Sequence, residues 1–276
     1  MKKIKALLSA LLVVIALPAL AQTQGGFRDE ASIYAETKQV NQFFRRFNNE
    51  ETVNGDRLYK GDPEFRNNTS RLKYLNILFD QESPAVLKLK QEFIDQVTRK
   101  RPFFLNFHGG NWFAQVNTVF SWHGKEEKLV LFLKLQEEKI GAKWVICNVN
   151  FPPFKNAFNK DTANNKFFLH PLSHEVDFMN LFRVFQDNKD HIEDYTSKEF
   201  SVDQLSMFLF ETKKSNLVFK TVTDVKFHFF QVDNWYFELS KFNRSGNNNG
   251  WLISNLVKIK GDEKEKLRQF IINRQE

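Results

Sequence analysis

Apolar and polar positions along the chain follow two kinds of pattern, and both kinds occur in each half. Apolar residues recur every three or four positions over residues 40–47 and 83–97 in the first half, and over 176–185 and 201–210 in the second. This spacing predicts four amphipathic helices. The pair Ser83–Pro84 supports the second of them, because proline is favoured in the first turn of a helix.

After each pair of predicted helices come short runs that are rich in aromatic and branched aliphatic residues. These runs cover 103–107, 112–122, 128–135 and 141–151 in the first half, and 217–222, 225–232, 235–242 and 248–259 in the second. Residues that favour turns separate the runs, among them Gly109, Gly110 and the pairs Thr223–Asp224 and Asp233–Asn234. Such runs and boundaries indicate β-hairpins. Each half is therefore predicted to end in a four-stranded antiparallel meander.

The last run of each half carries a similar sequence, GAKWVICNVNF at Gly141–Phe151 and NNGWLISNLVKI at Asn248–Ile259. Trp144 and Trp251 occupy the matching place, 107 residues apart. The shared order of elements predicts an internal repeat, with a first unit over 22–160 and a second over 161–276. The first unit is the longer one because it carries a polar insertion at 50–71. Convergent patterning among amphipathic elements is the alternative explanation.

Two helices followed by a curved antiparallel sheet form an α+β layer unit. This order of elements resembles the cystatin-like architecture and, within it, the NTF2-like cone, in which a bent sheet wraps a long helix. The resemblance implies an apolar pocket between sheet and helix, used for small ligands, for catalysis or for pairing with another unit. In the family's enzymes an acid–base pair lies inside that pocket. The expected fold is thus two tandem NTF2-like units of the α+β class.

The first 21 residues have the features of a cleaved signal peptide. Lys2, Lys3 and Lys5 precede an apolar run, and Ala19-Leu20-Ala21 ends it as a cleavage site. The run is too short to span a bilayer, so no stable membrane span is expected after cleavage. Removing three lysines and no acidic residue lowers the net charge from +7 to +4. This balance favours solubility rather than nucleic-acid binding, and the expected location is the periplasm or the extracellular space.

The single cysteine, Cys147, cannot form an intramolecular disulfide, so packing must stabilise the exported chain. Its position in the middle of a predicted strand favours a small buried residue. The 31 phenylalanines have two explanations that the sequence leaves open. They fill a large core, or they cover outer sheet faces against the second unit or a partner. Trp112, Trp122, Trp235 and Tyr236 are the candidates for contact with a ligand or partner.

The segment FFLHPLSHEVDF is the strongest candidate for metal chemistry. His170 and His174 are four residues apart, with Glu175 beside them, and histidines at that spacing share one face of a helix. Pro171 disfavours a helical residue before it. The competing interpretation is a helix start with Ser173 as the N-cap.

His108 and His123 each precede a glycine in a predicted turn, where a histidine near a pocket mouth can act as a general base. They are the candidate catalytic residues, with an ordinary turn role as the alternative. None of the local signatures of hydrolases, metalloproteases or nucleotide-binding loops occurs in the sequence. No cofactor is predicted.

The sequence therefore predicts an exported, non-enzymatic binding protein, in which a tandem α+β module binds a small molecule or another envelope protein and a homodimer is possible. An NTF2-like enzyme that acts on a small molecule in the pocket of one unit is the first alternative. A structural subunit of an envelope assembly is the second.

Overall fold

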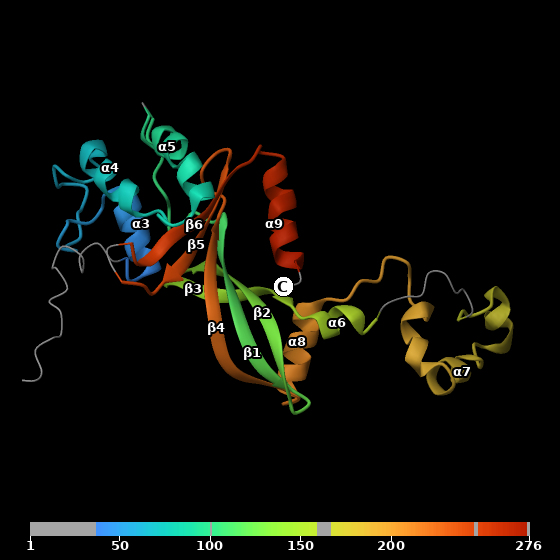
Figure 1. The fold of residues 1–276 in the computed structure, drawn as a ribbon. Helices are drawn as coiled ribbons and strands as arrows, with labels where there is room; N and C mark the ends of the chain where they lie inside the picture. The colour runs from blue at the N-terminus through green and yellow to red at the C-terminus, as the bar shows by residue number, and fades with distance from the viewer. Residues whose placement is uncertain (1–36, 100, 159–166, 246–247, 275–276) are drawn as a thin grey trace, which may run out of the picture.

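A computed structural model describes residues 37–99, 101–158, 167–245 and 248–274 (Figure 1). The helices are α3 (Val40–Asn48), α4 (Asn68–Ile77), α5 (Pro84–Thr98), α6 (Pro152–Asn156), α7 (Leu181–Gln186), α8 (Gln204–Lys213) and α9 (Glu263–Asn273), with the 3₁₀ helices η1 (Pro171–Val176) and η2 (Lys189–Tyr195). The strands are β1 (Trp112–Trp122), β2 (Lys125–Glu138), β3 (Gly141–Asn150), β4 (Leu217–Phe229), β5 (Trp235–Phe242) and β6 (Gly250–Lys258). The predicted signal peptide lies outside the described residues.

These strands form one antiparallel sheet in the order β3-β2-β1-β4-β5-β6. The prediction of two tandem four-stranded NTF2-like meanders is therefore wrong. Instead, two three-stranded meanders meet where β1 pairs with β4, for example at Trp112 opposite Phe229. Strands from both predicted units thus share a single hydrogen-bonded sheet, and Figure 1 shows this sheet as strongly twisted.

Two of the eight predicted strands are absent as separate strands. The run 103–107 is extended but pairs with no strand, because distant side chains satisfy its backbone. The Asn48 amide donates to the Leu105 carbonyl and accepts from the Leu105 N–H, each at 2.8 Å. In the second half, the predicted turn at Thr223–Asp224 is a bulge inside the continuous strand β4, marked by the register shift between Asn117 and Thr118.

The helices predicted over 40–47 and 83–97 are confirmed as α3 and α5, and the one over 201–210 corresponds to α8. The helix predicted over 176–185 is wrong. Asp177 and Phe178 adopt positive φ angles of 49° and 56°, which end η1 before the short helix α7 begins. Figure 1 places this segment of short helices apart from the sheet.

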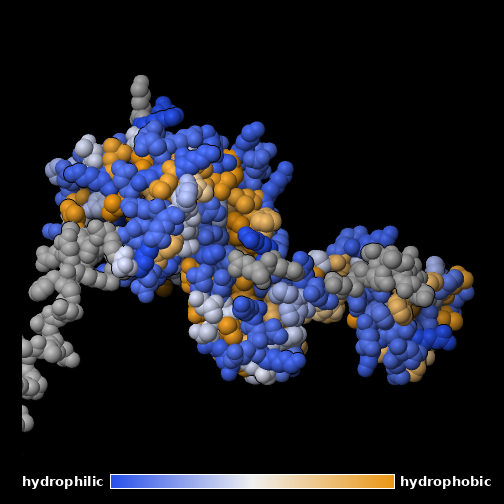
Figure 2. All heavy atoms as spheres, viewed as in Figure 1, coloured by the Kyte–Doolittle hydropathy of each residue, from blue (hydrophilic) through white to orange (hydrophobic). Residues whose placement is uncertain are grey.

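The main core lies between α3, α4 and α5 and one face of the sheet. Its fully buried side chains include Phe43, Phe47, Phe93 and Phe237, and the rings of Phe93 and Phe237 meet edge to face at 5.7 Å. A second cluster packs α6 and α8 against the far end of the sheet, and a third lies under α9 on the opposite face. Figure 2 shows apolar side chains reaching the surface in the seam beside α9.

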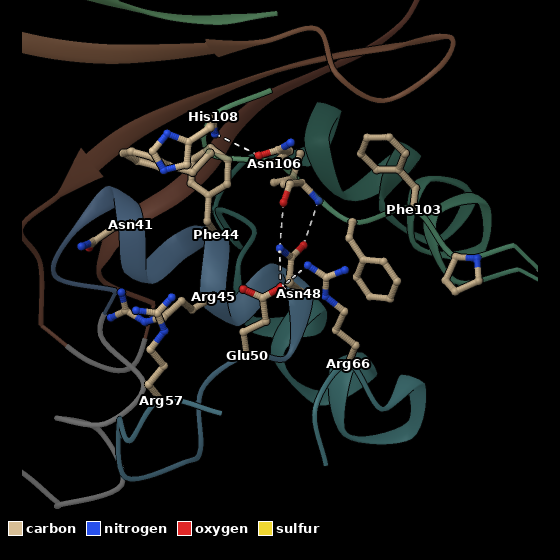
Figure 3. A pocket seen from close by; sticks show the side chains of 14 residues that line it. Asn41, Phe44, Arg45, Asn48, Glu50, Arg57, Arg66, Phe103, Asn106 and His108 are labelled. Carbon is tan, nitrogen blue, oxygen red and sulfur yellow. Dashed lines mark hydrogen bonds and ion pairs between the residues drawn. The ribbon is translucent and has the colours of Figure 1, made fainter. Parts of the chain in front are cut away.

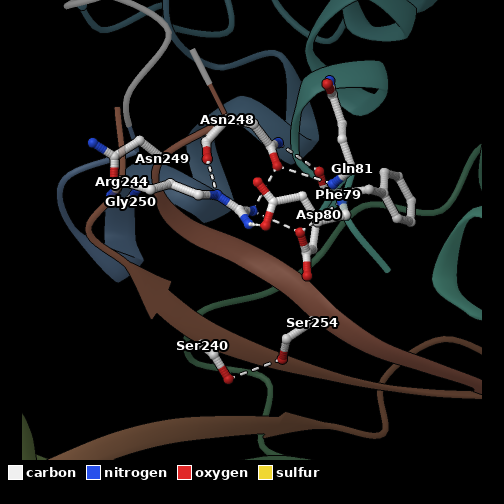
Figure 4. Close-up of polar contacts among 10 residues, drawn as sticks. Phe79, Asp80, Gln81, Ser240, Arg244, Asn248, Asn249, Gly250 and Ser254 are labelled. Atoms are coloured by element: carbon white, nitrogen blue, oxygen red, sulfur yellow. Dashed lines mark hydrogen bonds and ion pairs between the residues drawn. The ribbon is translucent and has the colours of Figure 1, made fainter. Parts of the chain in front are cut away.

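Polar contacts fix the β5–β6 loop to the helical layer (Figure 4). Arg244 donates to Asp80 at 2.6 Å and forms an ion pair with Glu82 at 2.6 Å. Asn248 donates to the Phe79 carbonyl at 2.7 Å. At Gly250 a Cβ atom would lie 2.5 Å from the Thr37 carbonyl oxygen, so this close approach requires glycine.

No helix among the described residues is both long enough and apolar enough to cross a membrane.

Candidate functional site

A cavity of about 760 Å³ lies between α3, the loop before α4 and residues 102–108 (Figure 3). We call it the arginine pocket. It is lined by Asn41, Phe44, Arg45, Asn48, Glu50, Arg57, Arg66, Pro102, Phe103, Phe104, Leu105, Asn106, Phe107 and His108. The volume lies within the range that is usual for small-molecule sites.

Three arginines reach the arginine pocket from separate parts of the chain. Arg45 comes from α3 and is held by Glu51 at 2.8 Å. Arg66 comes from the loop before α4 and is held by Glu50 at 2.6 Å. Within the described residues Arg57 makes no ion pair, and its guanidinium lies 5.3 Å from the centre of the Tyr59 ring.

A buried arginine shapes the far wall of this pocket. Arg71 donates to the backbone carbonyls of Phe47, Val97 and Phe103 at 2.6, 3.0 and 2.5 Å. Burial lowers the pKa of Arg71 to about 10, so the side chain remains a cation at neutral pH. The bond to Phe103 thus ties residues 102–108 to α3 and α5, whose carbonyls accept the other two bonds.

The apolar part of the lining is aromatic. Phe44 and Phe107 meet edge to face with ring centres 5.1 Å apart. The Arg66 guanidinium lies 4.6 Å from the centre of the Phe104 ring, a cation–π distance. The pocket thus places cationic groups next to rings that could contact an apolar ligand.

The two predicted catalytic histidines lie in different surroundings. His108 is exposed at the rim of the arginine pocket, and its Nδ1 lies 2.6 Å from Glu137 Oε1. His123 is exposed in the β1–β2 turn, with Nε2 3.7 Å from Glu211 Oε2. Each ring thus has a carboxylate beside it.

Three of the four predicted contact residues are part of the core. Trp112, Trp235 and Tyr236 are buried, and Trp122 is half-buried. The indole N–H groups of Trp112 and Trp235 donate to the Phe107 carbonyl at 2.9 Å and to Gln96 at 2.8 Å. The indoles of Trp112 and Trp235 thus support the fold, and ligand or partner contact at the four residues stays a prediction.

The predicted metal ligands lie on and beside the 3₁₀ helix η1. His170 is its N-cap and accepts the Leu172 N–H at 3.2 Å through Nδ1, the role that the sequence suggested for Ser173. His174 Nδ1 donates to the Pro171 carbonyl at 2.9 Å. Glu175 is exposed beside them. The described residues contain no group of three side chains that could hold a metal ion.

A second cavity, of about 430 Å³, lies between the sheet and α9, and we call it the α9 cleft. Its floor includes a buried polar network that the sequence analysis did not identify as a site. His228 Nε2 donates to Gln115 Oε1 at 3.0 Å, and its Nδ1 accepts from the Tyr236 hydroxyl at 2.8 Å. The signal for this network was present in the sequence, since His228 alternates with Phe227 and Phe229 and must face away from them.

Burial fixes the protonation states of this network. It lowers the pKa of His228 to about 3, with Lys226 adding to the effect, and it raises the pKa of Tyr236. At neutral pH the imidazole is therefore neutral and the phenol keeps its proton. The network acts as a fixed hydrogen-bonding frame and not as a proton relay.

No family model, curated protein or solved structure matches this chain.

Proposed function

We propose that the protein is an exported, non-enzymatic binding protein that holds a small organic anion in the arginine pocket. The observation that supports this most strongly is the convergence of Arg45, Arg57 and Arg66 on a cavity with a single carboxylate, Glu50, in its lining. A guanidinium group binds carboxylates and phosphates through two parallel hydrogen bonds. The excess of cations favours an anionic ligand over a neutral one.

Two of the three arginines are positioned before a ligand arrives. Arg45 and Arg66 each use Nε to bind a carboxylate at 2.8 Å, which leaves other N–H groups on the same fork for a ligand. Glu51 is itself held by the buried Arg46 at 3.1 Å. Such preorganisation lowers the entropy that binding must overcome.

The aromatic lining indicates that the anion carries an apolar portion. Phe44, Phe103, Phe104 and Phe107 border the same cavity as the arginines. Apolar walls with a few placed polar groups are typical of small-molecule sites. A molecule with a ring or short alkyl chain next to a carboxylate or phosphate would place its apolar part against the phenylalanines and its anionic group against the arginines.

The surroundings of the histidines favour binding over catalysis. His108 is the histidine of the arginine pocket, and its Nδ1 is engaged by Glu137. His228 is buried and hydrogen-bonded through both ring nitrogens. The predicted signal peptide supports export to the periplasm or beyond, where such a protein would meet its ligand.

Calorimetry with benzoate, phenyl phosphate and the neutral benzyl alcohol tests this proposal. We expect at least one anion to bind and the alcohol to bind at least 10-fold more weakly, because charge-assisted hydrogen bonds are worth about 1.5–3 kcal/mol. Arg57→Gln should weaken anion binding about 10-fold or more. Arg99→Gln removes the same charge outside the pocket and should leave binding unchanged.

Equal binding of the anions and the alcohol would overturn the proposal, and so would equal effects of the two arginine substitutions. Failure of both anions to bind more tightly than about 1 mM would overturn it as well.

A further inference from the structure

The α9 cleft carries a pair of opposite charges that no short contact neutralises. Lys226 on β4 and Glu238 on β5 lie on the same sheet face, with Lys226 Nζ 3.9 Å from Glu238 Oε1. Direct salt-bridge hydrogen bonds are about 2.7–2.9 Å long. The two charges therefore lie side by side at the floor of a cavity that belongs neither to the arginine pocket nor to the main core.

Of this pair, Glu238 gives the stronger indication of a ligand site. Its side chain is only 16% exposed. Yet the hydroxyl donors near it in the described structure, Ser240 and Ser254, lie at the long end of hydrogen bonding, at 3.4 and 3.3 Å. The Tyr236 hydroxyl lies 3.5 Å away and gives its proton to His228. A carboxylate with so little exposed surface usually has close partners. This one has room to accept a short hydrogen bond from a bound molecule.

The neighbouring network keeps the floor rigid and uncharged. His228 and Tyr236 are bound to each other, and His228 is bound to Gln115 as well. Because these hydrogen bonds are internally satisfied, the Lys226–Glu238 pair supplies the charged groups that the sheet offers to the cleft.

The opposite wall of the cleft comes from α9 and the residue after it, and it has an apolar part beside the charged side chains of Glu263, Lys266 and Arg274. Leu267, Phe270 and Ile271 form the apolar part, together with Val257 and Ile259 from the sheet side. No side chain of α9 is fully buried, so the helix covers the sheet without filling the space beneath it.

The helix is held in place at both of its ends. Lys264 Nζ donates to the Phe230 and Val232 carbonyls at 3.0 and 2.7 Å. At the other end the Asn150 amide donates to the Arg274 carbonyl at 2.5 Å. The roof of the cleft is thus fixed, and the cavity beneath it is a lasting feature of the fold.

We propose that the α9 cleft binds a small zwitterion of the α-amino-acid kind with an apolar side chain. Its ammonium group donates to Glu238, its carboxylate accepts from Lys226, and its side chain contacts Leu267, Phe270 and Ile271. The adjacent charges of the ligand are antiparallel to those of the Lys226–Glu238 pair, so both pairs are neutralised in one step. This site is separate from the arginine pocket and does not depend on the function proposed for it.

Calorimetry with L-leucine and L-phenylalanine tests the inference, with N-acetyl-L-leucine and L-leucinamide as ligands that lack one charge each. We expect at least one free amino acid to bind and each blocked leucine to bind at least 10-fold more weakly than leucine. Glu238→Gln and Lys226→Met should each reduce binding about 10-fold or more. Lys241→Met removes an exposed cation of β5 that lies on the opposite sheet face, outside the cleft, and should leave binding unchanged.

Thermal unfolding of each variant, followed by circular dichroism, shows whether a loss of binding reflects a loss of fold. If Glu238→Gln does not fold, Lys226→Met and the blocked ligands still decide the question. Binding of the blocked leucines as tightly as leucine would overturn the inference. So would the absence of amino-acid binding below about 1 mM, or amino-acid binding that Arg57→Gln abolishes, since that residue lies in the other cavity.

Discussion

The two three-stranded meanders of the sheet have the same strand order but very different surroundings. Trp144 on β3 and Trp251 on β6 occupy matching places in the sequence, and each lies in the third strand of its meander. Trp144 is 42% exposed, whereas Trp251 is 9% exposed. The local sequence is similar, so the difference comes from what packs on top.

The helices and the segment that links α4 to α5 cover β6 and so supply that difference. The segment before α5 runs alongside β6, where Phe79 forms a parallel bridge with Ile253 and Asp80 N–H donates to the Ile253 carbonyl at 3.0 Å. Trp251 also packs edge to face on Phe227 at 4.9 Å. Over β3 the ring of Trp144 meets Trp112 at 5.3 Å and Phe227 at 6.3 Å, but no backbone segment of the helical layer pairs with this strand in the described structure. Strand pattern sets pairing, but helices from elsewhere in the chain set burial.

The largest expected effect comes from truncating the two tryptophans. Trp251→Ala should lower the free energy of unfolding by about 3–5 kcal/mol, because it leaves a cavity in the core. Trp144→Ala should cost about 1 kcal/mol, since the exposed side chain loses less on removal. Urea denaturation of both variants measures the difference. Equal costs would mean that the two meanders are packed alike, against the contrast drawn here.

The second expected effect is a pH dependence of stability. It comes from His228, which the β4–β6 meander buries on the opposite sheet face. The folded protein holds the pKa of His228 near 3, whereas an unfolded histidine titrates near 6.5. Between these values the unfolded chain binds the proton and the folded chain does not. Stability should therefore fall as pH decreases below 6.5, by about 1.4 kcal/mol per pH unit.

Urea unfolding at pH 6.5 and 4.5 tests this pH dependence against His228→Gln, which has no titrating ring. The groups that face the ring are Tyr236, Gln115, Lys226 and Glu238. Wild type should lose roughly 2 kcal/mol more than the variant over this range. An identical pH dependence in the two proteins would show that His228 has the same pKa in the folded and unfolded states, against the effect of its burial.

Much of the strand arrangement could be predicted because its signal is local. The runs 112–122 and 235–242 are confirmed as β1 and β5 with the predicted bounds. The run 103–107 has the same aromatic pattern but is no strand. Its hydrogen bonds come from Asn48 and Arg71, and nothing in the run itself reveals partners so far away in sequence.

The two cavities depend on contacts that the sequence did not reveal. Arg57 and Arg66 lie in the stretch interpreted as a polar insertion, and only the fold brings them next to Arg45. The His228 side could be assigned from alternation along the strand. Its partner Gln115 is 113 residues away, and the helix α9 that covers the cleft was not predicted.

The smallest expected effect compares the hairpin ends of the two meanders. The β5–β6 loop is fixed by Arg244, which binds the buried Asp80 at 2.6 Å, the exposed Glu82 and the face of the Phe242 ring at 4.4 Å (Figure 4). The β2–β3 end carries the Lys143–Glu138 pair, both of whose side chains are exposed.

Arg244→Gln should therefore cost about 1–2 kcal/mol, because it leaves Asp80 without its charged partner. Lys143→Gln should cost less than about 0.5 kcal/mol, as is usual for solvent-exposed ion pairs. Raising the salt concentration to about 1 M should remove most of the Lys143 effect and less of the Arg244 effect, since buried pairs are screened less. If the two variants lose the same stability and respond equally to salt, the Arg244 contacts do not hold the second meander against the helical layer. In that case the burial of Trp251 depends on apolar packing alone.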